Sequence, residues 1–275
     1  MSSLVSTQWL AAHLNDADLA ILDATWHLPT LKRNAREEFV GAHIPGARFF
    51  DLDKTSDQHT TLPHMLPKAE HFAAIMGALG IGDDTHVIAY DGYGLFSAAR
   101  CWWMFKVFGH DKVSVLDGGL KKWLTEGRAT SSGEPPPAKP AHLSAVLNSS
   151  MVRNIQQVAE SQAQMADARS PTRFRGEEPE PRPGVRPGHK PGAKNVHYAG
   201  LVTENGTLKS ASALSGKFTA NGVDLDRPII TSCGSGVTAA ILTLALTELG
   251  VKDHALYDGS WAEWGASDKP TITGT

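Results

Sequence analysis

Residues 229–242 read IITSCGSGVTAAIL, and this order of residue types predicts a strand, a tight loop and a helix. The run Ile229–Ser232 is typical of a buried strand. Gly234 and Gly236 permit a sharp curl of the backbone. A helical pattern begins at Val237 and continues to Leu249. A strand that passes straight into a helix indicates an α/β fold.

The rest of the chain repeats this plan, with short β-branched runs such as 85–90 alternating with helical patterns such as 69–79. Three motifs occur twice: Asp-Ala at 23–24 and 167–168, His-x-Pro-Gly-Ala at 43–47 and 189–193, and Asp-Gly with a following Trp at 117–123 and 258–264. The first two pairs are about 144 to 146 residues apart. The halves are therefore diverged copies of one α/β unit.

A length of 275 residues suits two domains, and the proline-rich stretch 130–140 suits a tether between them. We predict a first domain at 1–130, a linker at 131–148 and a second domain at 149–275. Each domain is expected to be a mainly parallel sheet flanked by helices, because strands and helices alternate.

The composition excludes several classes of protein. With 41% hydrophobic and 20% charged residues and a formal net charge of −3, the chain has no basic field for nucleic acid. Apolar runs such as Ala239–Leu246 are too short to span a membrane, and no basic leader precedes them. We therefore expect a cytoplasmic location. No metal-binding, Walker or dinucleotide motif is found, so no metal or cofactor is expected.

The two cysteines have different surroundings. Cys101 lies in an apolar helical stretch, where a thiol usually acts as a small core side chain. Cys233 lies between a strand end and a helix start, where backbone N–H groups and the helix dipole stabilise an anion. A thiolate is expected there, and it would be a nucleophile. Aligning the Asp-Gly pairs places Gly92 opposite Cys233, so only the second half carries the thiol.

A cysteine loop before a helix also occurs in phosphatases of the C-x5-R type. Their arginine holds phosphate by a bidentate contact. The corresponding position here is Ala239, and the loop has no basic residue. Phosphate hydrolysis is disfavoured.

The loop Cys233–Thr238, both His-x-Pro-Gly-Ala segments and the tandem arrangement resemble the tandem-domain rhodanese superfamily, and within it the 3-mercaptopyruvate sulfurtransferases. The resemblance covers nearly the whole chain. It implies two rhodanese-like domains, the first non-catalytic, and a substrate-binding loop made of Gly234, Gly236, Val237 and Thr238. Thiosulfate-using relatives generally carry basic residues after the cysteine. The neutral loop here favours 3-mercaptopyruvate.

The resemblance further implies that Arg173 and Arg182 grip the carboxylate and carbonyl of the substrate. A planar arginine suits this task better than lysine. Taken without the resemblance, these arginines would form surface ion pairs with Glu177, Glu178 and Glu180, which are common and weak. Arg169, close to the strand-end Asp167, is interpreted as structural, and so is Arg175.

The same resemblance implies that three further residues form a Ser-His-Asp set. These are Ser235, His64 and Asp53, with the aspartate orienting the imidazole. The set would help the departing enolate of pyruvate by supplying a proton. His43 and His189 are interpreted as structural, because they occur in both halves.

The predicted activity is transfer of sulfur from 3-mercaptopyruvate through a Cys233 persulfide to a thiol or cyanide, with release of pyruvate. A small thiol or a thioredoxin-like protein is the expected acceptor. Two alternatives remain open at this point. The donor could be thiosulfate, or the chain could be a non-enzymatic persulfide carrier.

Overall fold

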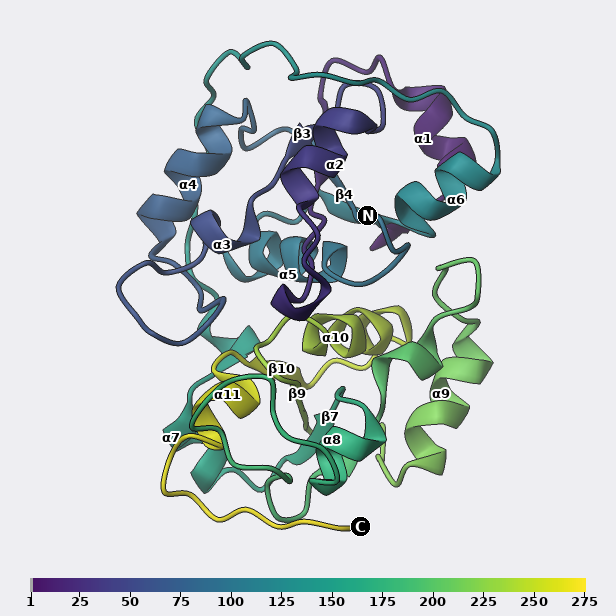
Figure 1. Cartoon of the computed structure of the whole chain (residues 1–275). Helices are drawn as coiled ribbons and strands as arrows, with labels where there is room; N and C mark the ends of the chain where they lie inside the picture. Colours follow the sequence, from purple (N-terminus) through teal and green to yellow (C-terminus); the bar gives the residue numbers. More distant parts are fainter. Residues whose placement is uncertain (1) are drawn as a thin grey trace. The chain divides into compact units, whose positions relative to one another are not determined.

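The computed structural model describes residues 2–275 and divides the chain into two compact units. The first unit contains the chain up to Asp57, Pro67–Asn148 and Glu204–Leu208. The second contains Gln58–Leu66, Ser149–Thr203 and Lys209–Thr275. Each unit thus includes a short segment from the opposite half of the sequence, which the sequence did not predict (Figure 1).

The first unit is built on a parallel five-stranded sheet in the order β1-β5-β4-β2-β3. Its strands are β1 (Leu4–Val5), β2 (Leu19–Asp23), β3 (Arg48–Phe49), β4 (His86–Tyr90) and β5 (Val113–Leu116). Its helices are α1 (Thr7–His13), α2 (Ala35–Gly41), α3 (Leu52–Thr55), α4 (Ala69–Ala78), α5 (Ala98–Val107) and α6 (Gly119–Thr125), with a 3-10 turn at Pro29–Leu31.

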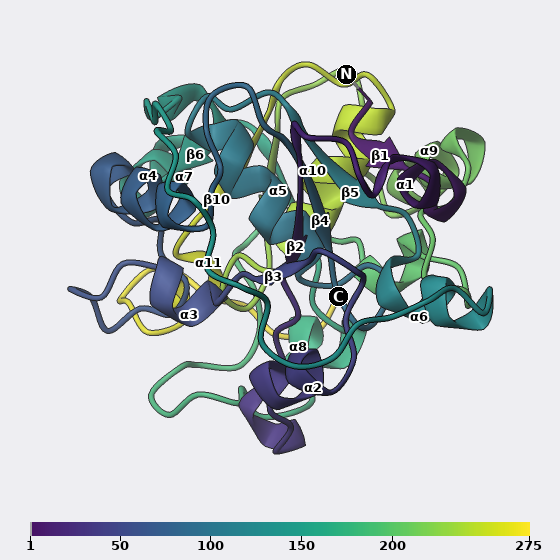
Figure 2. The ribbon, with the colours of Figure 1, turned by 90° about the horizontal axis from the view of Figure 1, so that it is seen from above.

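Helices cover both faces of this sheet. Leu10 of α1, Phe39 of α2 and Trp123 of α6 join sheet residues in one buried cluster. On the other face, Phe72 of α4 stacks on Phe108 just beyond α5. Figure 2 shows α4 and α5 on one side of the sheet and α1 and α6 on the other. Both faces are buried, as a parallel sheet requires.

The second unit repeats the architecture with the strand order β6-β10-β9-β7-β8, again all parallel. Its strands are β6 (Val152–Arg153), β7 (Gln164–Asp167), β8 (Lys194–Asn195), β9 (Ile229–Ser232) and β10 (His254–Tyr257). Its helices are α7 (Ile155–Glu160), α8 (Pro171–Arg175), α9 (Ala211–Ala220), α10 (Ala239–Glu248) and α11 (Ser260–Trp264), with 3-10 turns at Ser149–Met151 and Tyr198–Leu201. The predicted fold class, two α/β domains with parallel sheets, is confirmed.

Helix α10 begins at Ala239, two residues later than the sequence pattern predicts. Thr238 occupies the N-cap position, without a side-chain hydrogen bond to the helix, so Val237 and Thr238 belong to the loop. Residues Ala239–Leu246 are all buried. The helix packs on β9 and β10 of the second unit, and Thr231 of β9 forms a hydrogen bond with Thr243 of α10 (Oγ1–Oγ1, 2.8 Å).

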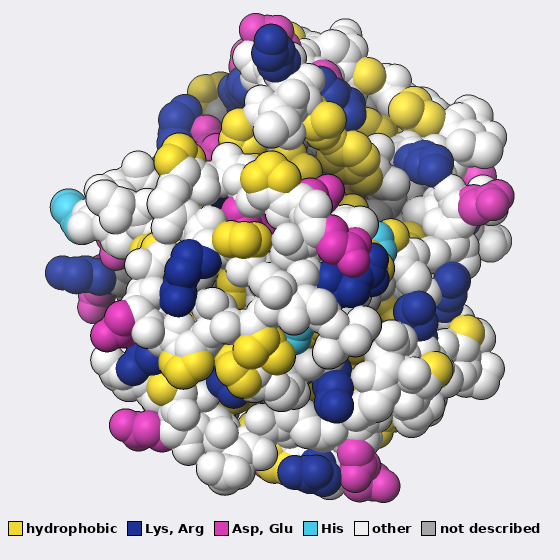
Figure 3. Space-filling view, turned by 60° about the horizontal axis from the view of Figure 1, so that its bottom comes forward, with side chains coloured by type: hydrophobic (Ala, Val, Ile, Leu, Met, Phe, Trp, Pro, Cys, Tyr) yellow, Lys and Arg dark blue, Asp and Glu magenta, His cyan; other side chains and the backbone are white. Residues whose placement is uncertain are grey.

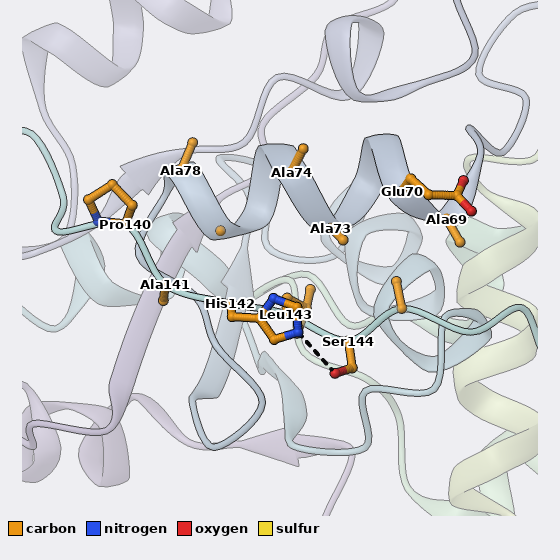
Figure 4. A pocket seen from close by; sticks show the side chains of 12 residues that line it. Ala69, Glu70, Ala73, Ala74, Ala78, Pro140, Ala141, His142, Leu143 and Ser144 are labelled. Carbon is orange, nitrogen blue, oxygen red and sulfur yellow. Dashed lines mark hydrogen bonds between the residues drawn. The ribbon is translucent and has the colours of Figure 1, made fainter.

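The segment 131–148, predicted to be a linker, is extended and packs on the first unit. Leu143 is buried, and the N–H of Ala141 donates to the carbonyl of Gly77 in α4 (2.9 Å). A Cβ on Gly77 would lie 2.5 Å from the Ala141 oxygen, so glycine permits this approach. Beside the contact runs an open groove (Figure 4), lined by Ala69, Glu70, Ala73, Ala74, Gly77, Ala78 and residues 140–145.

Charged side chains of both signs are interspersed on the face shown in Figure 3. In the described part of the chain, no helix is long and apolar enough to cross a membrane.

Candidate active site

Cys233 directly follows the last residue of β9, and its backbone is fixed on both sides. Its N–H donates to Ser260 Oγ (3.2 Å) and its carbonyl accepts from the Trp261 N–H (2.9 Å). The residue is 2% exposed. The strand end and the start of α11 therefore hold the thiol in one place.

The sheet register shows which residue of the first unit corresponds to Cys233. Asp23 pairs with Tyr90 in one sheet, and its counterpart Asp167 pairs with Ser232 in the other. The residue after Tyr90 is Asp91. The predicted alignment with Gly92 is therefore wrong by one position, because it relied on the Asp-Gly dipeptide and not on strand pairing.

Asp91 shows what this loop does in the first unit. Its carboxylate accepts five backbone hydrogen bonds of 2.7–3.1 Å, from the N–H groups of Tyr93, Gly94, Phe96, Ser97 and Ala98. Burial raises the pKa of Asp91, and the backbone hydrogen bonds oppose that shift. The loop is a cradle for an anion, and here the chain supplies the anion itself.

The Cys233 loop offers a similar cradle without an internal anion. It is one residue shorter, since Ala98 follows Asp91 by seven residues and Ala239 follows Cys233 by six. Gly236 takes a positive φ of 79°, which turns the backbone toward the helix start. Within residues 2–275, the N–H groups of 235–239 donate to no protein acceptor. These donors are available to an anion at the sulfur.

Ser235 and His64 are brought together in the second unit. Ser235 Oγ lies 2.9 Å from His64 Nδ1, and both residues are 6% exposed. His64 belongs to the exchanged segment Gln58–Leu66 and has a φ of 59°. This left-handed conformation costs an ordinary residue ~1–2 kcal/mol. Strain of this kind is concentrated at functional sites.

Asp53, the third member of the predicted set, lies in the first unit. Both of its carboxylate oxygens accept from the Trp26 indole N–H at 3.2 Å. Its pairing with His64 stays a prediction.

Arg173 lies against the cysteine loop. A Cβ on Gly234 would come within 3.0 Å of Arg173 Nη2 and 3.6 Å of Nη1. Glu180 binds the Nε–Nη2 edge of the guanidinium, accepting from Nε at 3.3 Å and from Nη2. Nη1 donates to no acceptor in the described chain. One edge of this cation is therefore fixed and another is available to a ligand.

A buried charge network supports Arg173. Arg169 is fully enclosed, donates to Asp167 and Glu180, and lies over the Trp261 ring at 4.4 Å. Burial alone would lower the pKa of Arg169, but the Asp167 and Glu180 carboxylates raise it. The structural interpretation of Arg169 is confirmed.

Taken without the family resemblance, the sequence predicts a surface position for Glu180, yet its side chain is 3% exposed. The sequence around Glu180 does not indicate this burial, because charged residues occur throughout the loop. Arg182 lies in the turn that follows and is half-buried. Its part in substrate binding stays a prediction.

His43 and His189 have the same surroundings in the two units. Each stacks on a phenylalanine and forms a hydrogen bond through Nδ1 to that residue's carbonyl: Phe39 at 2.7 Å and Phe174 at 2.8 Å. Burial lowers the pKa of His189. Both histidines are structural, as predicted.

Cys101 is fully buried in α5, and burial raises the pKa of its thiol, so it is a core residue.

No three His, Cys, Asp or Glu side chains gather as a metal site within residues 2–275. The chemistry that the site can offer is therefore that of the thiol, the loop N–H groups, the Ser235–His64 pair and the arginine.

Comparison with known proteins agrees with this fold. The model of the rhodanese-like domain matches residues 6–126 and 152–267. The chain belongs to the rhodanese-like domain family, with two copies of the domain.

Several characterised proteins are similar over almost the full chain. The human 3-mercaptopyruvate sulfurtransferase is 45% identical over 98% of this chain and 93% of its own length. A thiosulfate sulfurtransferase of Cricetulus griseus is 43% identical over 95% and 91%. The crystal structure of a 3-mercaptopyruvate sulfotransferase from Escherichia coli superposes with a TM-score of 0.87, at 43% identity, covering 95% of this chain and 99% of that one.

Proposed function

We propose that the chain is a sulfurtransferase that takes sulfur from 3-mercaptopyruvate, carries it on Cys233 as a persulfide and passes it to a thiol or cyanide. The observation that carries the proposal is the loop itself: Cys233 is followed by N–H groups that donate to no acceptor in the described chain, and Arg173 lies against Gly234, the next residue. Relatives with 3-mercaptopyruvate sulfurtransferase activity at 45% identity support the same donor.

In the first step the Cys233 thiolate attacks the substrate sulfur. A sulfur–sulfur bond forms and the carbon–sulfur bond breaks, with its electron pair moving to carbon as the enolate of pyruvate. The proton from the substrate thiol, relayed through Ser235 and His64, completes pyruvate at carbon. The loop N–H groups stabilise the persulfide anion that remains.

Arg173 would orient the substrate in this step. Its Nη1 edge is the one open to the substrate carboxylate, whereas Glu180 holds the other edge. A guanidinium that is already fixed loses little freedom on binding. Arg182 is the proposed second donor, to the carbonyl or carboxylate.

In the second step an acceptor thiolate attacks the outer sulfur, which restores the Cys233 thiolate. The two half-reactions give ping-pong kinetics. A small thiol or a thioredoxin-like protein is the proposed acceptor, and a cytoplasmic location stays a prediction.

Thiosulfate is the second candidate donor, favoured by the similar thiosulfate sulfurtransferase of Cricetulus griseus. The neutral loop speaks against it, since thiosulfate is a dianion and Gly234 and Ser235 bring no charge. Steady-state assays of both donors with one thiol acceptor distinguish them. We expect a higher kcat/KM for 3-mercaptopyruvate, with many pyruvate molecules released per chain. A preference for thiosulfate would overturn the donor, and a single turnover would indicate a carrier.

A further inference from the structure

The two exchanged segments are anchored by the same hydrogen bond. In the second unit the Leu66 N–H donates to Asp258 Oδ2 at 2.7 Å. In the first unit the Leu208 N–H donates to Asp117 Oδ1, also at 2.7 Å. Asp117 and Asp258 are the aspartates of the repeated Asp-Gly motif. The motif is therefore a receptor for a segment that comes from the other half of the sequence.

The backbone of the two segments also follows the same path. Two residues before each anchored leucine the φ angle is positive: 59° at His64 and 82° at Gly206. In the first unit a Cβ on Gly206 would lie 2.8 Å from the Gly94 Cα, so no side chain fits there. In the second unit the equivalent position carries an imidazole, which reaches Ser235 Oγ at 2.9 Å.

We propose that Asp258 is a positioning residue that places His64 on Ser235 by anchoring the segment at Leu66. The proposal rests on the proposed function for the role of His64. Asp258 is 4% exposed, so its hydrogen bond is shielded from water, and an ionised acceptor strengthens it. Only one residue separates His64 from the anchored Leu66. Loss of the bond would let the strained His64 backbone relax and move the imidazole away.

The position of His64 can be read without reference to activity. In protein labelled with ¹⁵N-histidine, the Nδ1 resonance of His64 reports its hydrogen bond to Ser235. We expect Asp258→Ala to shift this resonance to the value found in Ser235→Ala. Asp258→Asn, which keeps an oxygen acceptor, should restore most of the wild-type value. An unchanged resonance in Asp258→Ala contradicts the proposal.

The matched control is Asp117→Ala, which removes the same bond in the first unit, whose loop carries Asp91 at the position of Cys233. It should lower the melting temperature of the protein but leave the His64 resonance and kcat/KM unchanged. If Asp117→Ala shifts the resonance as much as Asp258→Ala does, the effect is general destabilisation and the proposal fails.

A double-mutant cycle adds the functional readout. Asp258→Ala should lower kcat by about tenfold or more, since small displacements of reacting groups have effects of this size. In the His64→Ala background the same change should cause no further loss. Losses that multiply would show that Asp258 acts on Cys233 and not through His64. If wild type released no pyruvate, the proposed function would fail. The His64 resonance in Asp258→Ala would still show whether Asp258 positions His64.

Discussion

Arg173 and Gly234 lie so close that a Cβ at position 234 would be 3.0 Å from Nη2 of the arginine. The contact gives a physical reason for the neutral loop. A basic side chain at 234 would displace the guanidinium and repel it, so this loop can accommodate either the arginine or a basic residue in that space. The proposed substrate role of Arg173 therefore predicts that donor preference depends on which cation occupies this space.

Gly234→Lys should raise KM for 3-mercaptopyruvate about tenfold, the loss expected when one charge-assisted hydrogen bond is disturbed. The change should affect thiosulfate turnover less, because lysine supplies a replacement charge for an inorganic dianion. Steady-state kinetics with both donors measure this. Gly216→Lys is the control, because a Cβ there meets nothing within 4 Å. Equal losses for both donors would contradict the account.

Arg173→Lys should raise KM for 3-mercaptopyruvate by about tenfold or more with a smaller change in kcat, since lysine cannot hold Glu180 and a carboxylate on two edges at once. Arg175→Lys is the matched control from the same helix, because Arg175 pairs with the exposed Glu177. A KM that does not change in Arg173→Lys would remove this residue from the substrate site.

Glu180→Gln should lower the free energy of unfolding of the second unit by about 3 kcal/mol, because it leaves the buried Arg169 without one of its two carboxylates. Urea unfolding followed by tryptophan fluorescence measures the loss. Glu177→Gln, at an exposed ion pair, should leave the unfolding midpoint unchanged. A stable Glu180→Gln variant would show that the network is not required for the fold.

Much of this fold was predictable because the sequence repeats itself. The Asp-Ala strand ends, the His-x-Pro-Gly-Ala turns and the strand–loop–helix around Cys233 depend on local composition and spacing. The sequence pattern predicts the start of α10 two residues too early, because Val237 and Thr238 continue the helical pattern while Gly236, with its positive φ, keeps the chain in the loop.

His254 makes stability depend on pH. Burial lowers its pKa, and its buried Nδ1 makes no hydrogen bond in residues 2–275. The unfolded chain, with a histidine pKa of about 6.5, therefore binds the proton more readily than the folded one. The contribution of His254 to stability is complete well above pH 6.5 and is lost progressively as the pH falls through that value. In His254→Gln the melting temperature should fall less steeply between pH 7 and 5.5. An identical slope in the variant would exclude this residue as the cause.

Other features could not be predicted from the sequence. Nothing in residues 58–66 or 204–208 indicates that each lies in the opposite unit, because the anchoring bonds run from backbone N–H groups, which every residue possesses. Asp91, the residue of the first unit that corresponds to Cys233, is identified only by the strand pairing within the two sheets. Glu180 forms an ion pair with the buried Arg169, which in turn lies over the ring of Trp261, a residue far along the sequence.

The central claim is that Cys233 carries the transferred sulfur, and whole-protein mass spectrometry after brief exposure to 3-mercaptopyruvate tests it most directly. Wild type and Cys101→Ala should each gain the mass of one sulfur atom and release one pyruvate per chain, whereas Cys233→Ser should gain none. A gain that persists in Cys233→Ser, or that disappears in Cys101→Ala, would contradict the account.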